Sequence, residues 1–172
     1  DDLSTGYREL LLGSGFVEGR AGDRERVEPL LREKKFDCVF HFAARSLVAE
    51  SVQKPQEYFE NNVLQTTALL EAMLAAGVRR FVFSSTAAIF GIPDRDTIDE
   101  STPKAPINPY GETKLEVERR LSAMAGERGL QAVALRYFNA CGAEPRLRVG
   151  ERHQPETHLI PNVLRAALSG EG

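Results

Sequence analysis

Tyr110 and Lys114 are the two residues whose types and spacing most directly suggest chemistry. They follow a loop rich in glycine and proline, and the spacing predicts that both side chains leave the same face of a helix. A neighbouring ammonium favours the phenolate, because positive charge stabilises the ionised form of an acid. A phenol with an ordinary pKa of about 10 could then serve as a general base. The alternative is a solvated pair on an amphipathic helix.

A second group of polar residues lies at the end of an apolar segment. Ser84-Ser85-Thr86 closes the predicted strand at 80–84, and Tyr-x-x-x-Lys follows after a long loop. Ligands of open α/β sheets bind at the carboxyl ends of strands, so these hydroxyls could bond a substrate oxygen. They could equally bond their own backbone in a Ser/Thr turn.

Four strands and four helices are needed to position these groups. Apolar runs predict strands at 15–19, 36–44, 80–84 and 131–137, and helical periodicity predicts helices at 23–35, 55–76, 110–127 and from 159 onward. This alternation is typical of βαβ units and predicts an α/β fold with a Rossmann-like, doubly wound parallel sheet. The run at 36–44 does not alternate, so we expect it to be covered on both faces.

Composition narrows the function classes. The chain has 172 residues, 42% of them hydrophobic, and a net charge of −3 with lysine and arginine scattered along it. These features argue against nucleic-acid binding. No apolar run approaches the ~20 residues of a membrane span, and the first residues do not resemble a signal peptide. Cys38 and Cys141 belong to no ligand pattern, so we expect a reduced, cytoplasmic protein.

The compound pattern of strand-end hydroxyl, tyrosine and lysine resembles the extended branch of the short-chain dehydrogenase/reductase family. Further blocks are similar to the UDP-glucose 4-epimerases of that branch. These blocks lie at 39–44, 50–55, 61–63, 135–143 and 155–161.

The resemblance implies an NAD-dependent epimerisation at C4 of a UDP-hexose, through a 4-keto intermediate. Tyr110 would be the acid/base, Thr86 would bond the reacting oxygen, and Lys114 would lower the tyrosine pKa and hold the cofactor ribose. The oxidised cofactor is regenerated in each cycle.

The same resemblance implies the contact residues. Cofactor contacts are expected from Asp1, Phe42, Ala43, Ala44, Asn62, Ser84, Tyr110, Lys114 and Phe138. Contacts with the UDP-sugar are expected from Thr86, Tyr110, Asn139, His158 and Leu159. A homodimer through the helices at 56–76 and 109–127 is implied, with neither nucleic acid nor membrane as partner.

Ala87 and Ala88 bear on the choice of reaction. Nucleotide-sugar dehydratases of this branch usually carry acidic residues after the threonine, because β-elimination needs a base at one carbon and an acid for the leaving hydroxyl. Epimerisation needs one acid/base and a hydride acceptor. Two alanines therefore favour an epimerase over a dehydratase or reductase, unless carboxylates elsewhere substitute.

The sequence departs from the family most clearly at the phosphate loop. The glycine-rich loop that cradles the dinucleotide pyrophosphate does not occur in the 172 residues, and Gly13-Ser14-Gly15 is too short to replace it. We therefore expect a partial NAD-binding domain over 1–172, with 138–172 entering the substrate-binding region. We also expect an incomplete sheet with unpaired edges and uncovered apolar surface. An inactive remnant that binds only a nucleotide or a partner remains the alternative.

Several single residues also depart from the family pattern or have side chains that could bind a ligand. Arg20 replaces an aspartate that bonds adenine in the family, and Gln65 replaces a small glycine on which close helix packing depends.

His41 is interpreted as a satisfied core histidine. His153 and His158 flank Glu156, but the spacing is not His-Glu-x-x-His, so no metal is expected.

Overall fold

The computed structural model describes residues 1–11, 13 and 15–170. The chain folds as two compact units. The first comprises Asp1 and Gly19–Phe138, and the second comprises Asp2–Glu18 and Asn139–Gly172.

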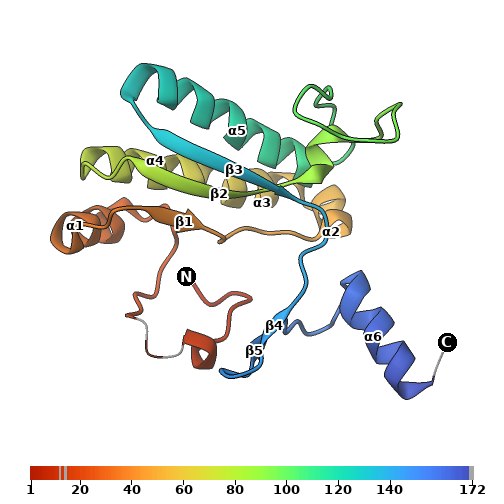
Figure 1. The fold of residues 1–172 in the computed structure, drawn as a ribbon. Coiled ribbons are helices and arrows are strands. Elements are labelled where there is room, and N and C mark those ends of the chain that lie inside the picture. Colours follow the sequence, from red (N-terminus) through yellow and green to blue (C-terminus); the bar gives the residue numbers. More distant parts are fainter. Residues whose placement is uncertain (12, 14, 171–172) are drawn as a thin grey trace. The chain divides into compact units, whose positions relative to one another are not determined.

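A parallel three-stranded sheet forms the centre of the first unit (Figure 1). Its order is β1 (Val39–His41), β2 (Arg80–Thr86), β3 (Gln131–Tyr137), and Thr86 pairs with Tyr137 at the carboxyl edge. The connections between these strands are helical, as parallel pairing requires. The predicted Rossmann-like α/β fold is confirmed.

Helices precede, connect and cover the strands. Their bounds are α1 (Arg24–Lys34), α2 (Val48–Gln53), α3 (Pro55–Phe59), α4 (Gln65–Ala75) and α5 (Pro109–Arg128), with a π-helical turn at Glu60–Leu64 and a 3₁₀ turn at Ala87–Phe90. The helix predicted at 55–76 therefore exists, but a π-helical turn interrupts it. The core lies between sheet and helices, where Phe81, Phe83, Leu70, Met73 and Val117 are at most 1% exposed.

The ends of α5 follow from local sequence. Asn108 caps the helix by accepting the Gly111 N–H at 2.8 Å, and Pro109 takes the first helical position. Gly129 ends it in the left-handed conformation at φ 69°. The position of Tyr110 in the first turn of the helix is therefore set by the residues on either side of it.

The expectation that the strand at 36–44 would be covered on both faces is wrong for the described residues. Phe40 and Phe42 are 64% and 62% exposed, and the strand is only three residues long. Val133, Leu135 and Tyr137 of β3 are also exposed. Helices α4 and α5 pack on the side of the sheet that carries Phe81 and Phe83, so the uncovered apolar surface expected from the sequence is present.

The strand predicted at 15–19 is also wrong. Residues 15–18 join no ladder within the described chain, although Gly19 donates its N–H to the Asp1 carbonyl at 3.1 Å. An apolar run becomes a strand only when a neighbour satisfies its backbone groups.

The second unit is smaller. It contains a 3₁₀ turn at Arg8–Leu11, an antiparallel pair of β4 (Ala143–Glu144) and β5 (Val149–Gly150), and α6 (Leu159–Ser169). The pair β4–β5 lies in a segment for which the sequence predicts only a loop. No described helix is both long and apolar enough to cross a membrane.

Candidate active site

Thr86 ends β2 and also begins the next turn. Its side-chain oxygen accepts the N–H of Ala88 at 3.2 Å, which starts the 3₁₀ turn, and the residue is 8% exposed. The backbone-bonding alternative for this hydroxyl is therefore realised. Because Oγ1 serves as the acceptor in that bond, the hydroxyl proton stays available for a second partner.

Tyr110 lies on the first turn of α5. Burial raises the pKa of Tyr110, while its hydrogen bond with Thr86 lowers that pKa. The net direction is upward. Thr86 therefore supports the phenolate, but burial outweighs this support in the free chain.

Lys114 lies one helical turn after Tyr110 in α5. The ammonium donates to the Ser84 carbonyl at 2.8 Å and lies 4.9 Å from the ring centroid of Phe83 and 5.8 Å from that of Tyr110. Only 3% of the residue is exposed, and burial lowers the pKa of the amine to about 8. The spacing thus brings the two groups to one face, as predicted, although the lysine bonds a carbonyl and not the phenol oxygen.

The start of α5 is fixed by contacts that the sequence interpretation missed. Tyr110 donates its backbone N–H to the Ser51 hydroxyl at 3.2 Å, and Ser51 in turn donates to the Val48 carbonyl. Gly111 faces Ala88 so closely that an added Cβ would lie 2.8 Å from the Ala88 carbonyl oxygen. The Asn-Pro pair before Tyr110 is a readable capping signal, whereas nothing in the sequence connects Ser51 to it.

Asn62 holds the loop that follows β1. Its side chain accepts the Arg45 N–H at 2.9 Å and donates to the Arg45 carbonyl at 3.0 Å and to Thr113 Oγ1 at 3.2 Å. Asn62 lies in the π-helical turn, a feature often found at functional sites. Its expected cofactor contact stays a prediction, and its observed contacts fix the segment between β1 and α2.

A buried ionic network secures the strand ends to α5. Glu118 accepts from Ser85 at 2.6 Å and from the Arg136 guanidinium at 2.9 and 2.8 Å. Burial would raise the pKa of the Glu118 carboxyl, but the hydrogen bonds from Arg136 and Ser85 outweigh it and lower that pKa. The network fixes the carboxyl ends of β2 and β3 against α5, which carries Tyr110 and Lys114.

His41 is a satisfied core histidine, as the sequence interpretation has it. Thr66 donates its hydroxyl to the Asn62 carbonyl, so the 2.8 Å contact of His41 Nε2 with Thr66 Oγ1 is a bond that the imidazole donates. The ring stacks on Phe83. Burial, and then the nearby Lys114 charge, lower the pKa of His41 to about 4.

Gln65 and Arg20 find partners that the sequence does not indicate. The Gln65 side chain accepts the Gly22 N–H at 3.1 Å, and Gly22 lies so close to Gln65 that a Cβ there would meet its Cα at 2.8 Å. The close approach is thus made by a glycine on the facing segment. Arg20 pairs with Glu60 at 3.4 Å.

The other predicted contact residues fall in both units. Phe42, Ala43 and Ala44 follow β1, and Phe138 follows β3 and is 72% exposed. The carboxyl ends of parallel strands lie at one edge, so these residues share the edge that carries Thr86. Asn139, His158 and Leu159 belong to the second unit, where His158 precedes the first residue of α6.

The parallel topology defines a Rossmann-like α/β protein, and the carboxyl edge of its sheet carries the candidate site residues Thr86, Tyr110 and Lys114. Residues 2–172 match the model of the "NAD dependent epimerase/dehydratase family", and the chain belongs to that family.

Individual relatives within this family include several UDP-glucose 4-epimerases. The chain is 49% identical to the UDP-glucose 4-epimerase of Lactobacillus helveticus over 173 residues, covering 100% of the chain and 52% of that relative. The crystal structure of UDP-glucose 4-epimerase from Brucella ovis in complex with NAD superposes with a TM-score of 0.94 at 44% identity, covering 99% of the chain and 52% of that structure. The UDP-Glc/GlcNAc 4-epimerase of Campylobacter jejuni is 38% identical with a TM-score of 0.79, over 100% of the chain and 54% of that structure. The chain thus spans about half the length of the relatives it matches.

Proposed function

We propose that the chain carries the catalytic half of an NAD-dependent UDP-hexose 4-epimerase that interconverts UDP-glucose and UDP-galactose. The observation that carries this proposal is the placement of the buried Lys114 ammonium 5.8 Å from the centroid of the Tyr110 ring, at the end of the strand that closes with Thr86. The Lactobacillus helveticus and Brucella ovis relatives, which match over 99–100% of the chain, are UDP-glucose 4-epimerases, and this supports the proposed reaction.

In this proposal each of the three residues has a separate task. Tyr110, as phenolate, takes the proton from the C4 hydroxyl of the sugar and later returns it. Thr86 donates to the oxygen that carries the charge, because its bond with the Ala88 N–H uses the hydroxyl only as an acceptor and leaves its proton free. Lys114 supplies a positive charge 5.8 Å from the centroid of the Tyr110 ring, and such a charge favours the phenolate over the phenol.

NAD is the cofactor in this proposal, and the site fits its nicotinamide end. Lys114 has three donors and uses one on Ser84, so two remain for ribose hydroxyls. When bound, NAD supplies the hydride acceptor for C4 and the donor for the keto sugar. The 172 residues contain no glycine-rich loop for the pyrophosphate, so we expect the chain to bind NAD more weakly than micromolar in calorimetric titration. A micromolar or tighter dissociation constant would contradict that expectation.

Ala87 and Ala88 favour epimerisation over dehydration. Both lie in the 3₁₀ turn that begins directly after Thr86, and neither offers a carboxyl group for β-elimination. Substrate contacts are assigned to Asn139, His158 and Leu159, so residues 138–172 would form part of the UDP-sugar site. A UDP-N-acetylhexosamine is a second candidate substrate, because the matching Campylobacter jejuni enzyme is a UDP-Glc/GlcNAc 4-epimerase.

We also propose a homodimer through the exposed side of α3 and α5. A groove of about 990 Å³ lies between α3, the π-helical turn and α5. Phe59 and Leu64 line it and are 43% and 47% exposed. Apolar side chains exposed in a groove between helices are typical of a helix-packing interface.

A chimera tests the catalytic proposal. The aligned half of the Lactobacillus helveticus epimerase is replaced by this chain, and conversion of UDP-glucose to UDP-galactose is measured with NAD present. Turnover well above that of a chimera carrying Lys114→Ala supports the proposal. A folded chimera that binds NAD but has no turnover would instead support the remnant alternative.

A further inference from the structure

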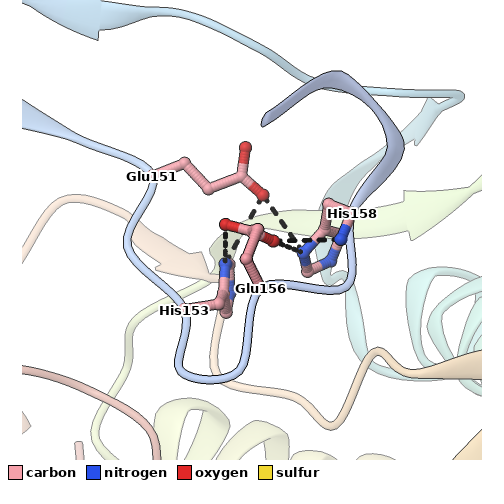
Figure 2. Close-up of side chains that lie close together, drawn as sticks. All are labelled: Glu151, His153, Glu156 and His158. Carbon is pink, nitrogen blue, oxygen red and sulfur yellow. Dashed lines mark hydrogen bonds and ion pairs between the residues drawn. The ribbon is translucent and has the colours of Figure 1, made fainter. Parts of the chain in front are cut away.

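Four side chains with metal-binding atoms meet in the segment between β5 and α6. Figure 2 shows Glu151, His153, Glu156 and His158 directed toward a common point. One ligand atom from each lies within 4.8 Å of the ligand atoms of the other three. The sequence interpretation considered His153, Glu156 and His158 and expected no metal, but it did not include Glu151.

The distances between these atoms match the edges of a small coordination polyhedron. His153 Nδ1 lies 3.4 Å from Glu151 Oε1 and 3.8 Å from Glu156 Oε2. His158 Nδ1 lies 3.2 Å from the same Glu151 oxygen and 3.1 Å from Glu156 Oε1. Zinc bound tetrahedrally at about 2.0–2.2 Å requires ligand atoms about 3.3–3.6 Å apart. The two histidines face different oxygens of Glu156, so a rotation of that carboxylate together with an inward shift of the side chains would give four bonds.

Hydrogen bonds within the cluster do not satisfy all of its polar atoms. Each imidazole Nδ1 faces both carboxylates, yet it can carry only one proton. His153 Nδ1 is inaccessible to solvent and has no hydrogen-bond partner among the described residues. The Glu156 side chain is 1% exposed. A cation bound between this buried nitrogen and the two carboxylates that it faces would give all three groups a partner.

Charge supports the same conclusion. With neutral imidazoles the cluster holds two carboxylates and carries a charge of −2, which a divalent ion would neutralise. The neighbouring cation in the segment, Arg152, instead pairs with Glu9 at 2.9 Å and lies 4.2 Å from the centroid of the Tyr7 ring. Imidazole ligands select zinc and similar transition metals over Mg²⁺ or Ca²⁺, which prefer oxygen ligands.

We propose that Glu151, His153, Glu156 and His158 form a site for a divalent transition metal ion of the zinc class. The ion would hold the segment 151–158 and fix the residue before α6, since His158 directly precedes Leu159. The role is structural, because the four protein ligands complete a tetrahedral shell. His158 takes part through Nδ1, so its Nε2 stays available for the proposed contact with the UDP-sugar. The metal site does not depend on the proposed epimerase activity.

Titration of the untagged, chelator-treated chain with ZnCl₂ tests the site. We expect one saturable equivalent of Zn²⁺ by calorimetry, no comparable binding of Mg²⁺, and a rise in the thermal unfolding midpoint with Zn²⁺. Co²⁺ in place of Zn²⁺ should give the visible absorption of a tetrahedral site. Because loss of even an outer partner weakens metal sites about 10–100-fold, His153→Ala and Glu151→Gln should each weaken binding by at least that factor.

Glu144→Gln is the matched control, because Glu144 is an exposed carboxylate of the same unit outside the cluster. It should leave Zn²⁺ affinity unchanged. Glu151→Gln keeps the shape of an exposed residue, so its fold can be checked by circular dichroism. Absence of saturable binding below millimolar Zn²⁺, or unchanged affinity in folded His153→Ala and Glu151→Gln, would overturn the proposal.

Discussion

The first turn of α5 packs directly on the turn after β2, where the backbone of Gly111 faces the carbonyl oxygen of Ala88. A β-carbon at Gly111 would lie 2.8 Å from that oxygen and 3.0 Å from the Pro106 side chain. Gly111 follows Tyr110, and Ala88 donates to Thr86. This close approach therefore holds the start of α5, which carries Tyr110, against the turn that follows Thr86.

Gly111→Ala should separate these two residues. The new methyl group has no room against backbone, so we expect a loss of roughly 1–3 kcal/mol in the free energy of unfolding. Gly126→Ala is the control in the same helix, because a Cβ at Gly126 meets nothing within 4 Å. The control should stabilise the chain by about 0.4–1 kcal/mol, since alanine lowers the entropy of the unfolded state. Equal effects in urea unfolding would show that Gly111 is not a tight contact.

Acid should destabilise the chain through His41. The pKa of this histidine is lowered from 6.5 to about 4 in the fold, so the unfolded chain binds the proton first as pH falls. Stability attributable to the neutral imidazole is then lost between about pH 6.5 and 4, by up to about 3 kcal/mol.

A His41→Phe variant isolates that effect. Phenylalanine can stack in the same place, and Thr66 keeps its hydrogen bond to the Asn62 carbonyl. Unfolding measured between pH 7 and 4.5 should show a smaller loss of stability in His41→Phe than in the original chain. Parallel curves for the two proteins would refute the role of His41.

Lys114 should show a conflict between stability and function. Burial lowers its pKa from 10.5 to about 8, so the fold disfavours the ammonium that predominates at neutral pH. Stability from this group should therefore rise as pH increases through about 8 to 10.5. Lys114→Met removes the buried charge and also its bond to Ser84, and we expect a net gain of roughly 1–3 kcal/mol. Urea unfolding at pH 7 measures it, and a loss of stability would contradict this account.

Much of the fold follows from local sequence signals. Asn108-Pro109 and Gly129 bound α5, and the apolar run at 131–137 matches β3 residue for residue. The strand at 15–19 could not be judged in this way, because a strand depends on partners elsewhere in the chain. The exposure of Phe40 likewise depends on which elements cover the sheet.

Some residues of the candidate site could likewise be predicted from the sequence, and others could not. Thr86, Tyr110 and Lys114 could be identified because their order and spacing form a recognisable pattern. Ser51 could not, since its bond to Tyr110 spans 59 positions in the sequence. The upward direction of the Tyr110 pKa was also missed, because spacing shows the neighbouring lysine but not the burial of the phenol. Glu151 joins His153 and His158 only through the path of the loop.

The most direct test of the central claim is Tyr110→Phe in the chimera with the Lactobacillus helveticus epimerase. Phenylalanine keeps the ring and removes only the phenol hydroxyl of Tyr110. Removal of a general acid/base group costs about 10²–10⁴-fold in rate, so kcat for UDP-glucose epimerisation should fall by that factor while NAD stays bound. Turnover equal to that of the unsubstituted chimera would show that Tyr110 is not the acid/base.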